Sequence, residues 1–180
     1  MTDVMIDIET LSVEPTAVIV SIAAVKFNRN VDKPVENLDQ IYIKVHRESC
    51  EILGMHTDEN TISWWQRQDA AIRYEALENP ENRVTIKEAL TKLTTWLGRS
   101  ELKIWSHGDD FDCVILSQAY QKCNMKTPWK FWNTRDTRTV LDLGNVNLTD
   151  IQIKNKHHPV YDCYRQILAI KKAFNNLKLY

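Results

Sequence analysis

The stretch Val4-Met5-Ile6-Asp7-Ile8-Glu9, close to the N-terminus, decides the fold. Its apolar residues are typical of a buried strand, and side chains alternate between the two faces of a strand. Asp7 and Glu9 therefore point to one face, with Cα atoms ~6.7 Å apart. Two carboxylates on an apolar strand are costly to bury unless a divalent cation neutralises them. A strand with one solvated face explains the pair equally well.

Further strands follow this segment along the chain. Residues 17–27 are apolar nearly throughout, which predicts a strand in the centre of a sheet. Residues 40–45 predict a third strand after a turn that contains Pro34. The short connections favour an antiparallel meander. Residues 102–105 predict a fourth strand, and residues 129–132 a short fifth one.

Helical patterns occupy the rest of the chain. The pattern at residues 85–97 is the clearest, because its apolar positions form one stripe that ends at Gly98. Other helices are predicted from Thr61 onward and over residues 70–77, 111–120, 136–143 and 160–174. This order predicts one α/β domain over residues 1–180, with a mixed five-stranded sheet flanked by helices. The ribonuclease-H-like architecture fits it.

Composition limits the classes of function. The 180 residues fit one domain, and a net charge of −1 excludes binding of a polyanion through a strongly basic surface. The four cysteines form no CxxC pair, so a zinc knuckle is not expected. The longest apolar run, residues 17–25, is shorter than the ~20 residues that span a bilayer. We expect a soluble cytoplasmic protein with reduced thiols and no membrane contact.

A third carboxylate, Asp112, is predicted in the first turn of the helix at residues 111–120. It flanks the apolar stripe of that helix and should therefore face the sheet. Asp109 and Asp110 are better candidates for capping the helix, so Asp112 is not needed for that role. This placement favours a function for Asp112 over a structural role.

A fourth carboxylate and a histidine lie near the start of the last helix. Pro159 suits the first helical position, which puts Asp162 at the end of the first turn and His157 in the preceding loop. Taken singly, such residues are more often structural or solvated than catalytic. Jointly, four carboxylates can balance two divalent cations, and a histidine can take a proton from water. This combination indicates metal-assisted hydrolysis of a phosphodiester.

The sequence resembles the DEDDh (DnaQ-like) 3′–5′ exonucleases of the ribonuclease-H-like superfamily. The family's D-x-E-T motif reads Asp7-Ile8-Glu9-Thr10, and its H-x4-D motif reads His157-His158-Pro159-Val160-Tyr161-Asp162. The second motif reads Gly108-Asp109-Asp110-Phe111-Asp112. The likeness is closer still to a phage and bacterial subgroup with phage exonuclease A, exodeoxyribonuclease VIII and small exoribonucleases. Residues 61–68 and 136–139 also agree with that subgroup.

The resemblance implies roles for individual residues. Asp7, Glu9, Asp112 and Asp162 would bind two Mg²⁺ or Mn²⁺ ions, and His157 would be the general base. His157 is preferred to His158 because only His157 keeps the five-residue step to Asp162. Substrate contacts would come from the residues Thr10, Leu11, Trp65, Gln68 and Phe111.

Adjacent tryptophans on a helix point ~100° apart, so only one of Trp64 and Trp65 is expected to face a given partner. Stacking of one ring on a nucleobase would explain the pair, and packing in the core or at an oligomer interface explains it equally well. Lys154, Lys156 and Arg165 flank the third motif and are the better candidates for phosphate contacts, and Arg135 and Arg138 are further ones.

These observations predict a 3′–5′ exonuclease that releases 5′-mononucleotides from the 3′ end of single-stranded DNA. An exoribonuclease that acts on RNA is the near alternative, and a nucleic-acid-binding module without catalysis is the distant one. The cytoplasm would be that of the host if a phage encodes the protein. Whether identical chains form an oligomer stays open at this level.

Overall fold

The computed structural model describes residues 2–31, 33–98, 101–153 and 158–179. Its centre is a six-stranded sheet with the strand order β4-β3-β2-β1-β5-β6. The strands are β1 (Thr2–Thr10), β2 (Ile19–Phe27), β3 (Gln40–Val45), β4 (Arg83–Val84), β5 (Leu102–Ser106) and β6 (Thr134–Asp136).

The sheet is mixed, as the sequence predicts. Strands β1, β2 and β3 form the expected antiparallel meander, whereas β5 runs parallel to β1 and β6 parallel to β5. Asp7 lies opposite Ala23 of β2, and Glu9 lies opposite Ser21. The register shifts between Glu9 and Thr10. Such an irregularity re-aims side chains at the end of a strand, and here it falls directly after the two carboxylates.

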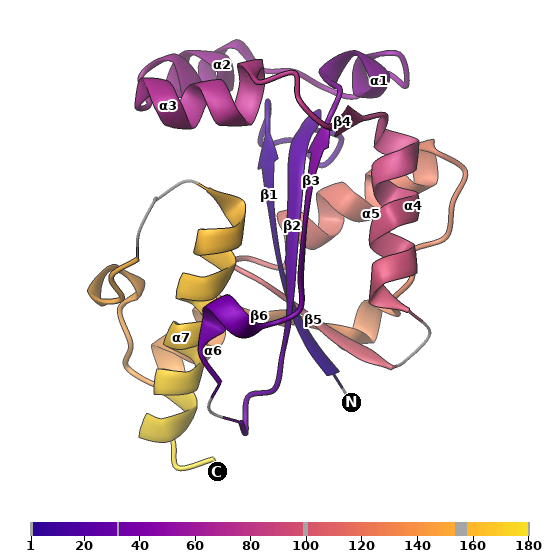
Figure 1. Ribbon diagram of the computed structural model, residues 1–180. Helices are drawn as coiled ribbons and strands as arrows, with labels where there is room; N and C mark the ends of the chain where they lie inside the picture. Colours follow the sequence, from indigo (N-terminus) through magenta and orange to yellow (C-terminus); the bar gives the residue numbers. More distant parts are fainter. Residues whose placement is uncertain (1, 32, 99–100, 154–157, 180) are drawn as a thin grey trace.

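Helices cover both faces of the sheet and one of its ends. In Figure 1, α7 lies on one face and α4 and α5 on the other, while α1, α2 and α3 lie across the end at which β1 finishes. The helices are α1 (Arg47–Glu51), α2 (Glu59–Gln66), α3 (Ala70–Arg73), α4 (Ile86–Leu97), α5 (Asp112–Lys122), α6 (Thr137–Leu143) and α7 (Pro159–Asn176). This layered arrangement confirms the predicted ribonuclease-H-like class.

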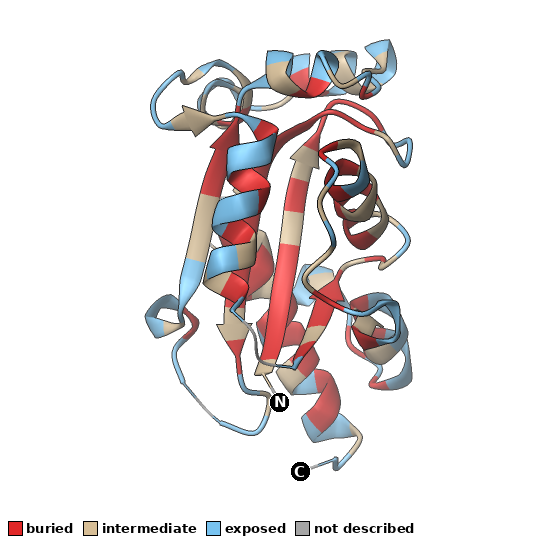
Figure 2. Ribbon diagram, turned by 90° about the vertical axis from the view of Figure 1, so that its right-hand side faces the viewer, coloured by how far each residue is buried: buried red, intermediate tan, exposed pale blue. Residues whose placement is uncertain are grey.

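Apolar side chains fill both spaces between the sheet and its helices. The outer face of α4 is exposed and its inner face is buried, as the striped helix at the front of Figure 2 shows. The buried residues of α4 are Ile86, Ala89, Leu90, Leu93 and Leu97. Thr85 and Glu88 start this helix with a reciprocal capping box, which fixes its first turn against the sheet.

The prediction of five strands is wrong in number and in one position. Residues 129–132 do not form a strand: Trp129 is buried against Tyr120, whereas Phe131 and Trp132 are exposed in a 3₁₀ turn. The edge strand β6 follows that turn, and its sequence, Thr-Arg-Asp, has no apolar alternation to reveal it. The other strand that the sequence does not predict, β4, has two residues and is too short to show an alternation of apolar residues.

Two details around the helices also differ from expectation. The cap position of α5 is Phe111, and neither Asp109 nor Asp110 caps the helix with its side chain. The short helix α1 has no counterpart in the prediction.

All four cysteines are buried and free. No helix within the described ranges is long and apolar enough to cross a membrane.

Candidate active site

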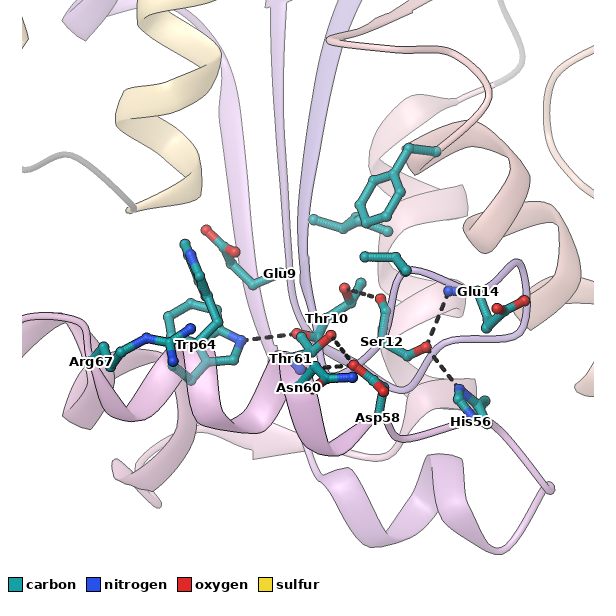
Figure 3. A pocket seen from close by; sticks show the side chains of 14 residues that line it. Glu9, Thr10, Ser12, Glu14, His56, Asp58, Asn60, Thr61, Trp64 and Arg67 are labelled. Atoms are coloured by element: carbon teal, nitrogen blue, oxygen red, sulfur yellow. Dashed lines mark hydrogen bonds between the residues drawn. The ribbon is translucent and has the colours of Figure 1, made fainter.

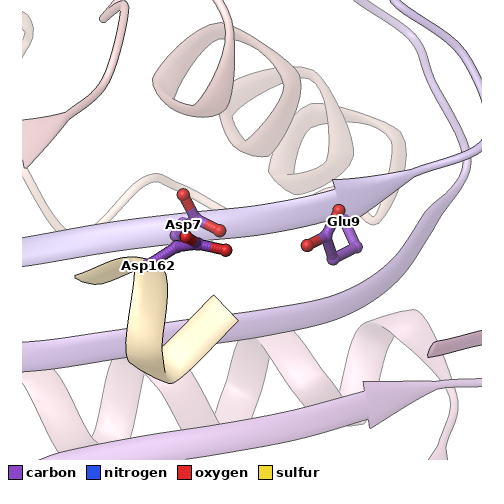
Figure 4. A group of neighbouring side chains, drawn as sticks. All are labelled: Asp7, Glu9 and Asp162. Carbon is purple, nitrogen blue, oxygen red and sulfur yellow. The ribbon is translucent and has the colours of Figure 1, made fainter. Parts of the chain in front are cut away.

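Three of the predicted carboxylates meet at the end of the first strand. Asp7 and Glu9 project from β1 and Asp162 from the first turn of α7, as Figure 4 shows. Ligand oxygens of the three residues all lie within 4.8 Å of one another. Residues that are 153 to 155 positions apart in the chain are thus close enough to hold one metal ion.

The fourth carboxylate, Asp112, lies on α5, which covers the face of the sheet opposite to α7 (Figure 1). It is 4% exposed in the first turn of α5, and its Oδ1 accepts a hydrogen bond of 3.0 Å from the backbone N–H of Ile8. The prediction that Asp112 faces the sheet is therefore confirmed. Asp112 lies outside the group of three, but its charge acts on both Asp7 and Glu9.

The carboxylates destabilise one another when they are ionised. Burial raises the pKa of Asp7 well above its usual value, and the charges of Asp112, Glu9 and Asp162 raise it further. Burial likewise raises the pKa of Glu9, with added repulsion from Asp162 and Asp112. The pKa of Asp112 rises to about 7, chiefly through burial. Clustered carboxylates with strongly raised pKa values are typical of functional sites.

One residue of the site, Gln166, was missed by the sequence analysis. It lies one turn after Asp162 on α7, is 3% exposed, and donates a hydrogen bond of 2.9 Å from Nε2 to Oδ1 of Asp7. This bond lowers the pKa of Asp7 against the larger effects that raise it. Its Oε1 is buried without a hydrogen-bond partner in the described part of the chain. The step of four residues from Asp162 is the signal that could have revealed it.

The predicted general base, His157, lies outside the described residues. Its neighbour His158 occupies the cap position of α7, with its ring 4.8 Å from that of Tyr42 and 5.3 Å from that of Tyr161. Burial lowers the pKa of His158. His158 is therefore packed among aromatic rings.

A cavity of about 650 Å³ adjoins Glu9. Figure 3 shows it between the end of β1 and helix α2, and its walls include Glu9, Thr10, Trp64, Arg67 and Phe111. Thr10 and Phe111, both predicted to contact substrate, thus line the cavity beside Glu9. The apolar and polar lining fits a ligand with both a ring and polar groups.

The two tryptophans of α2 have different environments. Trp65 is 1% exposed, and its indole N–H donates a hydrogen bond of 2.9 Å to the carbonyl of Thr10, so it fixes the end of β1. Trp64 is 38% exposed in the same cavity. As predicted, only one ring of the pair is exposed; it is that of Trp64, whereas the sequence predicts Trp65 as the substrate contact.

The remaining two predicted contact residues stand apart from this cavity. Leu11 is 2% exposed and belongs to the core. Gln68 is half-buried, and its Nε2 donates to the carbonyl of Trp64 at 3.1 Å. Neither side chain is among those that line the cavity beside Glu9.

Solved structures share this fold. Exonuclease I of E. coli in complex with a dA16 oligonucleotide matches 97% of this chain and 41% of its own, with 13% identity and a TM-score of 0.66. Exonuclease I from Methylocaldum szegediense matches 97% of this chain and 40% of its own, with 9% identity and a TM-score of 0.64. The chain spans about two fifths of the length of these exonucleases. At such identities the likeness concerns the fold.

Sequence comparison gives the class. The family model of the 3′–5′ exoribonuclease Rv2179c-like domain matches residues 2–174. The exodeoxyribonuclease of Enterobacteria phage T4 is 27% identical over 96% of this chain and 89% of its own. Fold and family together define a 3′–5′ exonuclease and confirm the resemblance to the DnaQ-like enzymes. The chain belongs to the family of Rv2179c-like 3′–5′ exoribonuclease domains.

Proposed function

We propose that this chain, as a single exonuclease domain, removes 5′-mononucleotides from the 3′ end of single-stranded DNA. Asp7, Glu9, Asp112 and Asp162 hold two Mg²⁺ or Mn²⁺ ions, and His157 is the general base. The observation that carries the proposal is the meeting of Asp7, Glu9 and Asp162 within 4.8 Å. The site works in the cytoplasm, which is that of the host if a phage encodes the chain.

The donor set fits divalent metal ions. Carboxylate oxygens are the ligands that Mg²⁺ and Mn²⁺ prefer, and four ionised carboxylates balance the charge of two such ions. The raised pKa values of Asp7 and Glu9 come from burial and mutual repulsion, both of which a bound cation relieves. When bound, the metal ions supply charge stabilisation at the attacking and leaving oxygens of the phosphodiester.

The residues of the chain provide orientation and proton transfer. Asp112 is held by the backbone N–H of Ile8, and Asp7 by Gln166, so both carboxylates are oriented before substrate arrives. His157 takes a proton from the attacking water. The resulting hydroxide then adds to the phosphorus of the 3′-terminal phosphodiester. The 3′ oxygen of the next nucleotide leaves, and the released nucleotide keeps the phosphate on its 5′ side.

The cavity beside Glu9 receives the 3′-terminal nucleotide. Thr10 and Phe111 line it next to the carboxylates, and the exposed ring of Trp64 offers a surface for stacking the base. Stacking on an aromatic ring contributes ~1–3 kcal/mol per base and requires no particular sequence. Trp65 and Gln68 act on this cavity indirectly, through their hydrogen bonds to the backbone of Thr10 and Trp64. Leu11 supports the turn after β1 from the core.

RNA is the second candidate substrate. The matching family is described by its exoribonucleases, whereas the phage T4 relative is an exodeoxyribonuclease. Discrimination between the two depends on contacts to the 2′-hydroxyl. Our preference for DNA rests on the relative that aligns over most of both chains.

The decisive experiment is a matched cleavage assay. Single-stranded DNA and RNA of one sequence, labelled at the 5′ end, are incubated with Mg²⁺, Mn²⁺ or EDTA. We expect a metal-dependent ladder that shortens from the 3′ end, with the DNA consumed faster. A faster reaction on RNA would make the chain an exoribonuclease. Binding of both strands without any product would instead support a module that has the fold but no catalysis.

A further inference from the structure

Of the candidates for phosphate contacts, Lys154 and Lys156 lie outside the described residues, and the environments of the three arginines separate these from one another. Arg135 donates from Nη1 to the carbonyls of Trp132 and Thr134, at 2.9 and 2.6 Å. Arg165 donates from Nε to the carbonyl of Leu148 at 3.1 Å. Both arginines thus hold backbone. The side chain of Arg138, exposed in the first turn of α6, makes no hydrogen bond or ion pair with the described residues.

A glycine lets this free guanidinium lie close to the second motif. Gly108 follows β5 with a φ of +100°, and a Cβ there would come 2.9 Å from Nη1 of Arg138 and 3.1 Å from its Cζ. The guanidinium therefore lies directly over the backbone of Gly108. The N–H of Gly108 also donates to Oδ1 of Asp136, the cap residue of α6, which fixes the two segments together.

The position of Arg138 faces both the carboxylates and open solvent. Its charge is close enough to Asp112 to oppose the rise in pKa that burial causes there. It also lines a surface hollow of about 420 Å³ together with His107 and Asn147. A guanidinium that is exposed, has no ion pair with the described residues and adjoins a hollow is suited to an anion from outside the chain.

Two acidic side chains compete for this guanidinium: Asp142 lines the same hollow, and Asp110 lies beside Gly108. Oδ1 of Asp110 would lie 3.2 Å from the same Cβ at Gly108, yet Asp110 and Arg138 form no ion pair. Asp110 therefore lowers the affinity of this position for anions without occupying it. Removing the carboxylate should strengthen anion binding.

The order of the strands gives the direction of a bound nucleic acid. The cavity for the terminal nucleotide lies at the end of β1 under α2, and the carboxylates follow on β1. Arg138 lies beyond β5, at the end of β6. A strand with its 3′ end in the cavity and its cleaved bond at the carboxylates would continue toward β6.

We infer that Arg138 binds a backbone phosphate of the single strand on the 5′ side of the cleaved bond. The inference rests on the proposed function for the direction of the strand. A guanidinium can donate two parallel hydrogen bonds to a phosphate, which positions the strand without reading its sequence. Arg138 would hold the strand for repeated cleavage without touching the bond that is hydrolysed.

The test compares wild type with Arg138→Gln and Arg138→Lys on a ten-nucleotide strand and on a dinucleotide. Binding of the labelled ten-nucleotide strand is measured in EDTA by fluorescence anisotropy at several salt concentrations. Arg138→Gln should weaken binding about tenfold and reduce the slope of log Kd against log salt by about 0.7 to 1. Arg138→Lys should recover part of the loss, and Asp110→Asn should strengthen binding.

Kinetics distinguish this role from a structural one. In Arg138→Gln, KM for the ten-nucleotide strand should rise with kcat nearly unchanged, because the contact is made equally before and during the reaction. The dinucleotide has no phosphate beyond the cleaved bond, so its cleavage should not change. Arg47→Gln removes the same charge from α1, where Arg47 pairs with Glu51, and is the control.

An unchanged salt slope in Arg138→Gln, or an equal loss of kcat on both substrates, would overturn the inference. If the wild-type chain binds strands without cleaving them, the proposed function fails. The anisotropy measurements still decide whether Arg138 holds a phosphate in that case.

Discussion

Asp7 is the carboxylate on which the other charges of the site act most directly. Asp7→Ala should reduce cleavage by more than about a hundredfold, because even residues that only support metal ligands contribute about 10- to 100-fold. The same change should raise the stability of the metal-free chain at neutral pH, since it removes repulsion with Asp112, Glu9 and Asp162. Cleavage assays and thermal melts in EDTA measure the two effects.

Asp150→Ala is the control for Asp7→Ala, because Asp150 is exposed and outside the cluster. It should change neither quantity. Wild-type activity in Asp7→Ala would show that the assignment of the site is wrong.

Gln166 should matter through Asp7. Gln166→Leu removes the hydrogen bond that orients Asp7 and should weaken Mn²⁺ binding about 10- to 100-fold, as measured by titration calorimetry. Gln166→Glu keeps the size of the side chain but adds a fifth negative charge, so it should destabilise the metal-free chain. Gln121→Leu, at an exposed position of α5, is the matched control and should leave Mn²⁺ affinity unaltered. Equal Mn²⁺ affinity in Gln166→Leu would exclude a positioning role.

At the scale of single residues, the sequence indicates a functional residue where its polarity differs from that of its neighbours. Asp7 and Glu9 stand out because they are acidic on an apolar strand, and Asp112 because it flanks an apolar stripe. Gln166 does not stand out, since a glutamine on a helix is ordinary until its buried contact with β1 is known. The choice of Trp64 over Trp65 in the cavity also needed the structure, because it depends on the rotation of α2.

Among the elements, α6 and α7 pack closely at Gly144. A Cβ at Gly144, at the end of α6, would come 2.5 Å from Cβ and 2.7 Å from Cα of Ala173 on α7. Gly144→Ala should therefore separate the helices and destabilise the chain by about 1–3 kcal/mol, measured by urea unfolding. The sign of the change in unfolding free energy decides whether the clash is present. The backbone of Gly144 has a φ of −83°, so without the clash the change should stabilise by about 0.4–1 kcal/mol.

The predictability of the elements follows their length and pattern. The stripe of α4 and the apolar run of β2 are long enough to identify from the sequence, and both are observed. Strands β4 and β6 have two and three residues and exist because longer neighbours pair with them. Residues 129–132 resemble a strand in composition, but Trp129 is drawn into the core by Tyr120 while Phe131 and Trp132 are left in solvent. Tertiary packing overrides local preference there.

For the whole molecule, the acid cluster couples stability to pH and to metal. The pKa of Asp112 is about 7 in the folded chain against 3.8 as its ordinary value, so folding takes up a proton near neutrality. The metal-free chain should therefore lose stability as the pH rises from about 4 to about 7, by up to about 1.4 kcal/mol per pH unit for each proton bound, and the last part of this loss falls above pH 6.5. The raised pKa values of Asp7 and Glu9 act in the same direction.

Two histidines act in the opposite direction at lower pH. Burial lowers the pKa of His107 and of His158, so these rings favour the folded state increasingly as the pH rises toward about 6.5. Above that pH both are neutral in either state, and the carboxylates alone determine the slope. Thermal melts in EDTA should be limited to this upper range. A stability that is flat or rising there would contradict the raised pKa values.

Mn²⁺ should remove this pH dependence. Metal binding requires ionised carboxylates, so the affinity for Mn²⁺ rises with pH, and the stability gained from a ligand rises with its affinity. At a fixed saturating excess of Mn²⁺, the melting temperature should stay level between about pH 6.5 and about pH 8, where in EDTA it falls, because neither the metal-bound nor the unfolded chain then binds a proton on these carboxylates. Asp112→Asn should flatten the EDTA profile and diminish the Mn²⁺ effect together, because one group causes both. If Asp112→Asn removed only one of these two effects, the carboxylate that titrates and the carboxylate that binds metal would be different groups.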